Sequence, residues 1–150
     1  MKKTYLIPLI LLSFCLVVGI ARAETFTVPP LHEHTTSIGL SDGDKVSGSI
    51  SVVGGSGNDI NFYVTDPNGN TIRRYDRVTQ TSFSFSASMT GTYVMHFDNS
   101  FSLLSSKSVT LDYTVTKTIL GIPQEYFLVL LIVVVVIIVA VVVVLARRRK

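Results

Sequence analysis

A long apolar run near the C-terminus is the feature that most constrains this chain. Residues 126–146 carry no charged side chain and consist mostly of Val, Ile and Leu. As a helix the run would be roughly 31 Å long, about the thickness of the hydrocarbon core of a bilayer. A segment inside lipid must satisfy its own backbone hydrogen bonds, which a helix does. The sequence therefore predicts a transmembrane helix over residues 126–146, with the lipid bilayer as one partner.

The residues after this run predict how the chain is oriented. A buried core helix is the alternative, but such helices seldom stay apolar on every face for six turns. Because cations at the end of a membrane helix favour the cytoplasm, residues 147–150 form a predicted cytoplasmic tail and everything before the span lies outside. Outside means the cell surface, or the secretory lumen if the cell is eukaryotic. The cations that set this topology are Arg147, Arg148, Arg149 and Lys150.

A second apolar block opens the chain and has the pattern of a secretory signal. Lys2 and Lys3 precede an apolar stretch over residues 6–20, and Ala21 and Ala23 are small residues at the positions that a signal peptidase reads. Residues 1–23 are thus predicted to be a signal peptide, with Glu24 opening the mature chain. An uncleaved anchor is the alternative.

Charge and cysteine content restrict what the exported part can do. The whole chain has a formal charge of +3, but residues 24–125 hold six basic and ten acidic side chains, hence a formal charge of −4. The basic residues elsewhere are topology signals, so no nucleic-acid partner is expected. The single cysteine, Cys15, lies in the predicted signal. The exported domain must therefore fold by core packing alone.

Between the two apolar blocks the sequence alternates with a period of two. Ile60, Phe62 and Val64 share one face of a predicted strand, and Asp66-Pro67-Asn68-Gly69 then has the residues of a tight turn. The alternation recurs in residues 46–52, 83–85, 93–97 and 109–115, and residues 24–28 and 35–40 read as two earlier strands. We expect an all-β domain over residues 24–117, an antiparallel β-sandwich of about eight strands. Residues 118–125 form only a short juxtamembrane connector before the membrane helix.

Two segments resemble a known family. Residues 91–99 read Gly-Thr-Tyr-Val-Met-His-Phe-Asp-Asn, similar to the G-x-Y-x-x-C-F-x-N strand of the GOLD (Golgi dynamics) domain, and the turn over residues 66–69 is similar to that family's Asp-Pro-x-Gly turn. Signal, sandwich, single span and basic tail also follow the order of its transmembrane members. The resemblance implies a GOLD or jelly-roll-like sandwich and a cargo-receptor role in protein transport of the early secretory pathway.

The family motif maps onto particular residues of this chain. Their expected roles are structural, in turns and in the core. His96 stands where the family strand has a disulfide cysteine, and residues 118–125 are too short to form the coiled coil expected before the membrane. The motif residues are Asp66, Pro67, Gly69, Gly91, Tyr93, Phe97 and Asn99.

Residues that point to enzymatic or metal chemistry are few. His32 and His34 flank Glu33, but two imidazoles make a weak metal site, and a solvated loop after Pro29 and Pro30 is the simpler interpretation. The aspartates beside Gly, Asn or Pro suit turns better than calcium. We expect no enzyme activity, no catalytic residue, no metal and no cofactor.

Two functions are compatible with these features. The first is a membrane-anchored binding or adaptor domain that contacts another exported or lumenal protein, as the GOLD resemblance implies. The second is a structural or adhesive surface protein of the cell envelope. Of the two, the sequence favours the adaptor.

Overall fold

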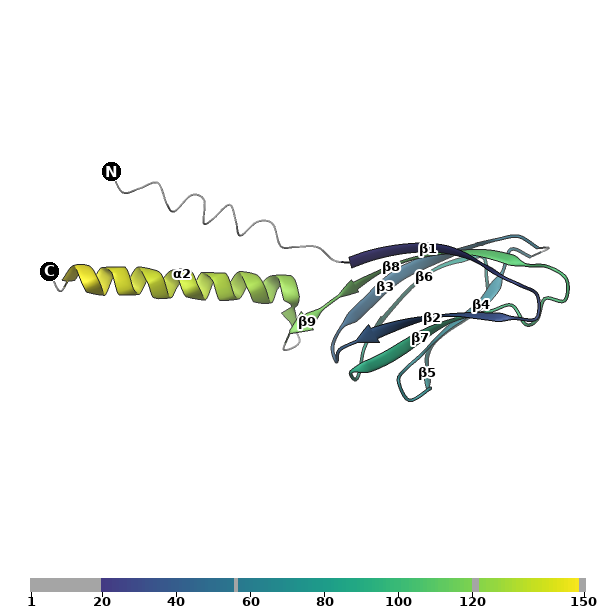
Figure 1. Cartoon of the computed structure of the whole chain (residues 1–150), viewed down its shortest axis with the longest axis horizontal. Coiled ribbons are helices and arrows are strands. Elements are labelled where there is room, and N and C mark those ends of the chain that lie inside the picture. The colour runs from purple at the N-terminus through teal and green to yellow at the C-terminus, as the bar shows by residue number, and fades with distance from the viewer. Residues whose placement is uncertain (1–19, 56, 120–121, 149–150) are drawn as a thin grey trace. The chain divides into compact units, whose positions relative to one another are not determined.

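The computed structural model describes residues 20–55, 57–119 and 122–148. Eight strands form two four-stranded antiparallel sheets that face each other, confirming the predicted β-sandwich (Figure 1). The strands are β1 (Ile20–Val28), β2 (Glu33–Leu40), β3 (Lys45–Val53), β4 (Ile60–Thr65), β5 (Thr71–Val78), β6 (Gln80–Ser86), β7 (Gly91–Asp98) and β8 (Lys107–Thr116).

The order of strands differs from their order in the chain. One sheet, called the β1 sheet, has the order β1-β8-β3-β6, and the other, called the β2 sheet, has the order β2-β7-β4-β5. Consecutive strands therefore often lie in different sheets, and the central pairings β3–β8 and β4–β7 join distant parts of the sequence. Such crossovers are typical of a sandwich, in which each sheet buries its inner face against the other sheet.

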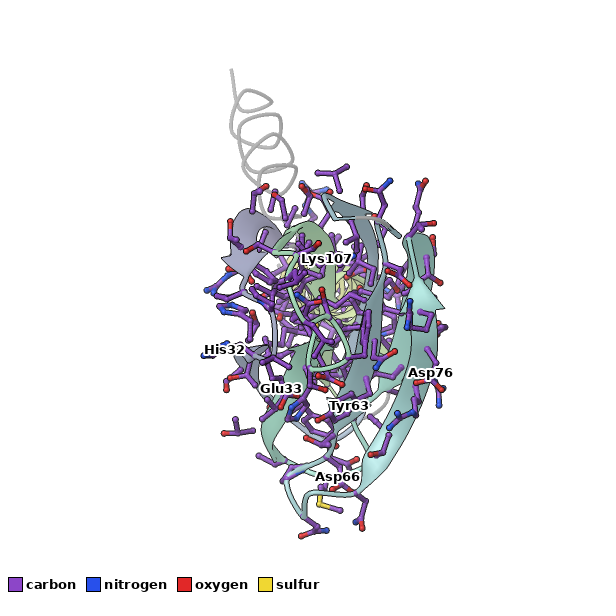
Figure 2. The ribbon with its side chains drawn as sticks, turned by 90° about the vertical axis from the view of Figure 1, so that its right-hand side faces the viewer. His32, Glu33, Tyr63, Asp66, Asp76 and Lys107 are labelled. Carbon is purple, nitrogen blue, oxygen red and sulfur yellow. The ribbon has the colours of Figure 1, made fainter. Side chains whose placement is uncertain are left out.

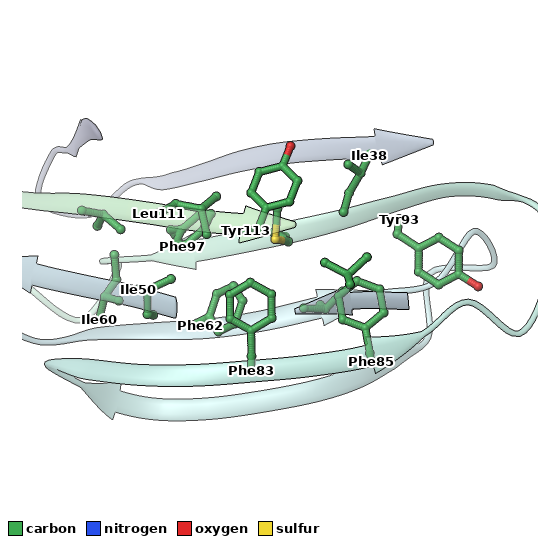
Figure 3. Packing of buried hydrophobic residues seen from close by; sticks show 14 of the residues in the cluster. Ile38, Ile50, Ile60, Phe62, Phe83, Phe85, Tyr93, Phe97, Leu111 and Tyr113 are labelled. Carbon is green, nitrogen blue, oxygen red and sulfur yellow. The ribbon is translucent and has the colours of Figure 1, made fainter. Parts of the chain in front are cut away.

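Aromatic and branched side chains from both sheets fill the space between them (Figure 3). The Phe62 ring is fully buried and lies 4.9 Å from the Phe83 ring across the sandwich and 5.2 Å from the Phe97 ring on the neighbouring strand. The alternation noted in the sequence accounts for this core. Ile60, Phe62 and Val64 point inward, whereas the residues between them are only partly buried.

The predicted hairpin after residues 60–65 is present, and it joins β4 to β5. The amide of Gly69 donates to the carbonyl of Asp66 at 2.9 Å, and the amide of Asp66 donates to the carbonyl of Asn70 at 2.9 Å. Gly69 has a φ of +84°, a conformation that glycine adopts without strain.

Two strands begin earlier than the sequence predicted. Strand β2 includes Glu33 and His34, which pair with Asp98 and Phe97, so the predicted solvated loop was wrong for these two residues. The His34 ring stacks on Phe26 at 4.0 Å, an interaction that only the folded arrangement supplies. Strand β1 begins at Ile20, and cleavage after Ala23 would leave Glu24 to Val28 to pair with β8.

The C-terminal unit contains the predicted span. Strands β9 (Thr118–Ile119) and β10 (Ile122–Pro123) pair with each other, and helix α2 (Gln124–Arg148) follows. The helix is two residues longer at each end than the predicted 126–146. It buries no side chain, and among the described residues it is the one helix long and apolar enough to cross a membrane. Apart from residues 20–23, the predicted signal peptide lies outside the described residues.

Because Phe62 is fully buried between the sheets, a cavity at this position should destabilise the fold strongly. We expect Phe62→Ala to lower the free energy of unfolding by about 3–5 kcal/mol, because the lost ring leaves both sheets without a packing partner. Leu104→Ala is the control and should change it by less than about 0.5 kcal/mol, since Leu104 is exposed. Denaturant unfolding followed by the near-ultraviolet circular dichroism of the tyrosines measures both, and equal effects would contradict this account of the core.

Candidate functional site

The motif residues of the first turn organise the β4–β5 connection. The Asp66 side chain accepts hydrogen bonds from the amide of Asn68 at 2.9 Å, the amide of Asn70 at 2.8 Å and the side-chain amide of Asn70 at 3.1 Å. The side-chain bond from Asn70 and then the backbone amides hold the pKa of Asp66 below its ordinary value, against the opposing effect of desolvation. Asp66 therefore caps the turn as a carboxylate.

The two halves of the family motif touch each other. Gly91, the first residue of β7, faces Pro67 in the β4–β5 turn, and a β-carbon on Gly91 would lie 2.6 Å from Cγ of Pro67. No side chain fits at that distance, so the glycine permits this close approach. Sequence spacing alone did not reveal the contact, because Pro67 lies in the β4–β5 turn and Gly91 begins β7, 24 positions later in the chain.

The remaining motif residues are buried. The Tyr93 hydroxyl accepts from the amides of Ser88 and Met89, at 3.0 and 3.3 Å, and donates to the carbonyl of Met89 at 3.2 Å. Phe97 packs against Phe62 in the core.

Asn99 joins two connections by its side-chain amide. This group donates to the carbonyls of Val28, Pro29 and Ser105 at 3.2, 3.1 and 3.0 Å. It thereby links the β1–β2 connection to the loop after β7. These contacts leave Asn99 with no exposed surface to offer a ligand.

A surface cluster that the sequence did not predict lies on the outer face of the β2 sheet. We call Glu33, Tyr63, Thr65, Arg74 and His96 the Tyr63 cluster; Glu33 and Tyr63 are labelled in Figure 2. The Tyr63 hydroxyl donates to Oε1 of Glu33 at 2.7 Å, and Nδ1 of His96 lies 2.7 Å from the same oxygen. Nε2 of His96 lies 3.1 Å from Oγ1 of Thr65. All four strands of the sheet contribute to this cluster.

Strand register explains how the cluster assembles. His96 pairs with Tyr63 across β7 and β4, and Tyr63 pairs with Arg74 across β4 and β5. The Tyr63 and His96 rings stack with centroids 4.3 Å apart, and the guanidinium of Arg74 lies 5.6 Å from the Tyr63 ring. In the sequence, the one indication of the Tyr63 cluster was that its residues do not belong to the buried face of their strands. The register between the strands was also needed to show that these residues are neighbours.

The electrostatics of the Tyr63 cluster keep its tyrosine protonated. Desolvation, and then the hydrogen bond to Glu33, raises the pKa of Tyr63 to about 12. The hydroxyl therefore remains a donor at any physiological pH. The cluster has the residues of a recognition surface, a rigid ring beside exposed charge. His32 does not join it, because its Nδ1 lies 2.7 Å from the carbonyl of Pro30.

Metal ligands do not converge in the described part of the chain. No group of three or more His, Asp or Glu side chains there has an arrangement that would hold an ion. His34, one of the two histidines considered from the sequence, stacks on Phe26.

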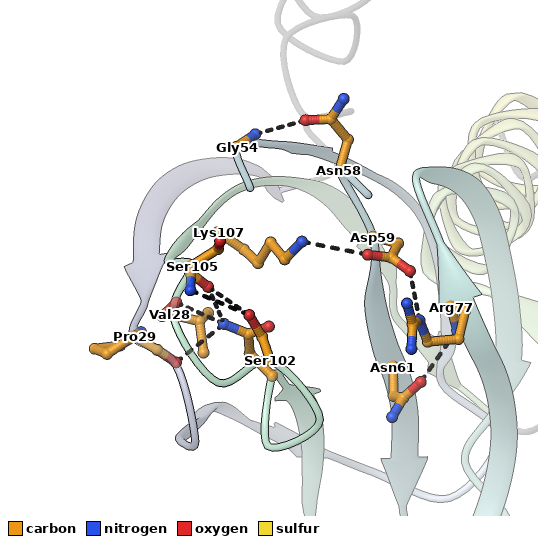
Figure 4. A network of polar contacts seen from close by, with 11 residues as sticks. Val28, Pro29, Gly54, Asn58, Asp59, Asn61, Arg77, Ser102, Ser105 and Lys107 are labelled. Atoms are coloured by element: carbon orange, nitrogen blue, oxygen red, sulfur yellow. Dashed lines mark hydrogen bonds and ion pairs between the residues drawn. The ribbon is translucent and has the colours of Figure 1, made fainter. Parts of the chain in front are cut away.

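A second polar network lies at the end of the sandwich where β8 begins, at Lys107 (Figure 4). We call this end the distal end. The carboxylate of Asp59 forms ion pairs there with two basic side chains. Nζ of Lys107 lies 3.3 Å from Oδ1, and Nε of Arg77 donates to Oδ2. Burial would raise the pKa of Asp59, but the bonds from Arg77 and Lys107 outweigh it and lower the pKa. The carboxylate is therefore ionised and anchors the almost fully buried Lys107.

The topology residues are described in part. Arg147 and Arg148 lie in the last turn of α2, where a cation also suits the negative end of the helix dipole. Arg149 and Lys150 lie outside the described residues.

The sandwich and the helix together define a membrane-anchored protein with an all-β domain and, among its described residues, one helix that can span a membrane. A sequence profile of the emp24/gp25L/p24 (GOLD) family matches residues 23–125, which is more than half of the chain. The chain belongs to this family.

Individual relatives agree with that assignment. Transmembrane emp24 domain-containing protein 3 of Mus musculus is 32% identical over 111 residues, covering 73% of this chain and 50% of the relative. Transmembrane emp24 domain-containing protein 7 of Homo sapiens is 31% identical over 97 residues, covering 65% and 43%. The chain thus spans about half the length of the curated relatives it matches. These matches do not favour the alternative of a cell-envelope structural protein.

Solved structures show only a loose likeness. The periplasmic inhibitor of g-type lysozyme PliG from Aeromonas hydrophila covers 65% of this chain and 87% of its own, with 13% identity and a TM-score of 0.46. A likeness of that size carries no conclusion about function.

The contact between Gly91 and Pro67 predicts a position-specific effect. Gly91→Ala should lower the free energy of unfolding by about 1–3 kcal/mol, because the added methyl group overlaps Pro67 and forces the turn and β7 apart. Gly39→Ala is the matched control, since a β-carbon on Gly39 meets nothing within 4 Å. Thermal unfolding of both variants measures the difference, and a neutral Gly91→Ala would contradict the contact.

The buried carboxylates predict loss of stability in acid. Hydrogen bonds and ion pairs, outweighing desolvation, lower the pKa of Asp44 and Asp59 from an ordinary value of 3.8. Groups with a lowered folded pKa stabilise the fold above their unfolded pKa, and this stabilisation is lost as the pH falls through the folded pKa. The free energy of unfolding should therefore decrease below about pH 4.

A paired variant checks the cause of this acid response. Asp44→Asn with Asp59→Asn should be less stable at neutral pH and should lose less stability on acidification, as measured by denaturation midpoints across the pH series. Parallel pH profiles for the variant and the parent chain would assign the acid response to other groups.

Proposed function

We propose that this chain is a type I membrane protein whose exported sandwich binds a partner or cargo protein, so that it serves as a membrane-anchored adaptor in protein transport. The observation that carries the proposal is the Tyr63 cluster on the outer face of the β2 sheet. Tyrosine and arginine are enriched among the residues that dominate binding energy at protein interfaces. Membership of the emp24/gp25L/p24 family supports the transport role.

Charge at the helix ends supports the orientation. Arg147 and Arg148 lie at the C-terminal end of α2, and the only charged residue in its first turn is Glu125. Cations favour the cytoplasmic side, and this preference supports a sandwich in the lumen or at the cell surface. The predicted signal peptide over residues 1–23 gives the same orientation.

The geometry of the outer face suits a protein partner. Tyr63 and His96 are held by each other and by Glu33, so binding would cost little side-chain entropy. Arg74 pairs through its Nε with Asp76 at 2.9 Å, and because just over half of its side chain is exposed, its guanidinium can still meet an acidic group on the partner. Small polar residues such as Thr35 and Ser37 flank the cluster on β2 and leave the face open.

Site-specific photocrosslinking in intact membranes tests this surface. A photoreactive residue at Ser37, on the outer face of the β2 sheet, should capture a second protein. The matched control is Ser47, an exposed serine on the outer face of the β1 sheet, where we expect little capture. Tyr63→Ala should lower the yield at Ser37 by about fivefold, because the central ring is lost.

Two results would count against the proposal. Equal capture at Ser37 and Ser47 would show that the β2 sheet is not the contact face. Efficient crosslinking that recovers only copies of this chain would argue against an adaptor role.

A further inference from the structure

Exposed apolar side chains of the sandwich gather at the distal end. Among the described residues of the sandwich, the large apolar side chains classed as exposed are Leu31, Val53, Leu103 and Leu104, with Leu104 92% exposed. They come from the β1–β2 connection, the end of β3 and the loop after β7. The amide of Leu31 donates to the carbonyls of Asn99 and Ser102 at 3.2 and 3.0 Å, which holds the β1–β2 connection against the loop after β7. Exposed leucines held in place by such bonds are a surface that a partner can desolvate.

A hollow of about 350 Å³ opens beside Leu103 and Leu104. Asp59, Arg77 and Lys107 line its polar part, and Phe101, Leu103 and Leu104 line its apolar part. The volume is at the small end of the range for ligand sites and suits one or two side chains rather than a large cofactor. The hollow therefore places fixed charge next to apolar surface.

The charges in the hollow do not balance. Two cations, Arg77 and Lys107, share the single carboxylate of Asp59. The guanidinium of Arg77 lies 3.9 Å from the centroid of the Phe101 ring, and only its Nε bonds to Asp59. Among the described residues its two terminal nitrogens have no hydrogen-bond partner. A cation that is partly desolvated and has free donors favours an anion with two acceptor oxygens.

We propose that the distal hollow binds a carboxylate side chain flanked by apolar residues in an extended segment of a partner protein. The carboxylate would pair with Arg77 and the neighbouring apolar side chains would cover Leu103 and Leu104. This site is separate from the Tyr63 cluster and does not depend on the function proposed for that surface.

The position of the cations favours a peptide over a membrane surface. The Lys107 side chain is only 3% exposed and lies inside the hollow, where a plane of lipid headgroups would not reach it. Arg77, with 57% of its side chain exposed, is the cation at the rim. An extended chain can insert one carboxylate between the loops, whereas binding to anionic lipid draws on many exposed cations.

Fluorescence anisotropy on the full chain in neutral phosphatidylcholine nanodiscs tests the site. The probe is the labelled, C-terminally amidated peptide Gly-Ser-Leu-Glu-Leu-Ser-Gly, and its partner peptide has Gln in place of Glu. We expect the Glu peptide to bind about tenfold more tightly, because only it offers a carboxylate to Arg77. Equal binding of the two peptides, or binding of neither, would overturn the proposal.

Two arginines provide a matched pair of variants. Arg77→Gln should weaken the Glu peptide about tenfold. Arg73→Gln removes the same charge from the same strand, at an exposed residue that belongs neither to the hollow nor to the Tyr63 cluster, and should change affinity less than about twofold. Equal losses would show that surface charge alone attracts the peptide.

A third variant keeps the test valid if Arg77→Gln unfolds the chain. Leu104→Ser changes a side chain that is almost fully exposed, so it should fold, and we expect it to weaken the peptide about threefold. Unchanged affinity in Leu104→Ser would remove the leucines from the site. If vesicles containing phosphatidylserine bind the nanodisc-held chain and lose binding in Leu104→Ser, while the peptides show no preference, the distal end contacts membranes and the proposal is wrong.

Discussion

Packing of two sheets around buried aromatic rings is the interaction on which the rest of this structure depends. The chain has one cysteine, so no internal disulfide can hold the sheets together. The Phe62 ring lies 4.9 Å from Phe83 and 5.2 Å from Phe97, and these three rings connect strands from both sheets. With the interior taken up by apolar residues, the polar groups that can recognise a partner are left on the outer faces and at the ends.

The family motif serves this packing by fixing how the strands are connected. Pro67 and Gly91 meet where the β4–β5 turn lies against the start of β7. Asn99 ties the far end of β7 to the carbonyls of Val28 and Pro29, where β1 ends, and to the carbonyl of Ser105 in the loop after β7. The two contacts hold β7 at both ends, which positions His96 between them on the outer face. The motif residues of the family thus support the Tyr63 cluster, which we propose binds a partner protein, but they are not part of that cluster.

Much of the fold could be predicted from the sequence, whereas the candidate sites could not. Alternation identified β4 and β7, and the Asp-Pro-Asn-Gly sequence identified the turn after β4, because these signals come from neighbouring residues. The Tyr63 cluster depends on register across four strands, which no local pattern contains. The distal network likewise joins Asp59 to Lys107 across 48 positions of sequence. Glu33 and His34 were assigned to a loop for the same reason, since their pairing partners are on β7.

The sequence by itself determined that this chain has a membrane span and a β-sandwich. Continuous hydrophobicity over a bilayer thickness and a period of two are properties of adjacent residues, so they can be read without coordinates. Only the tertiary structure decided which polar residues meet. Tyr63 with His96, and Asp59 with Arg77 and Lys107, come together because strand pairing and sheet packing bring distant segments within hydrogen-bonding range. Such long-range contacts are set by the packing of the whole core, and the local pattern of residues does not encode them.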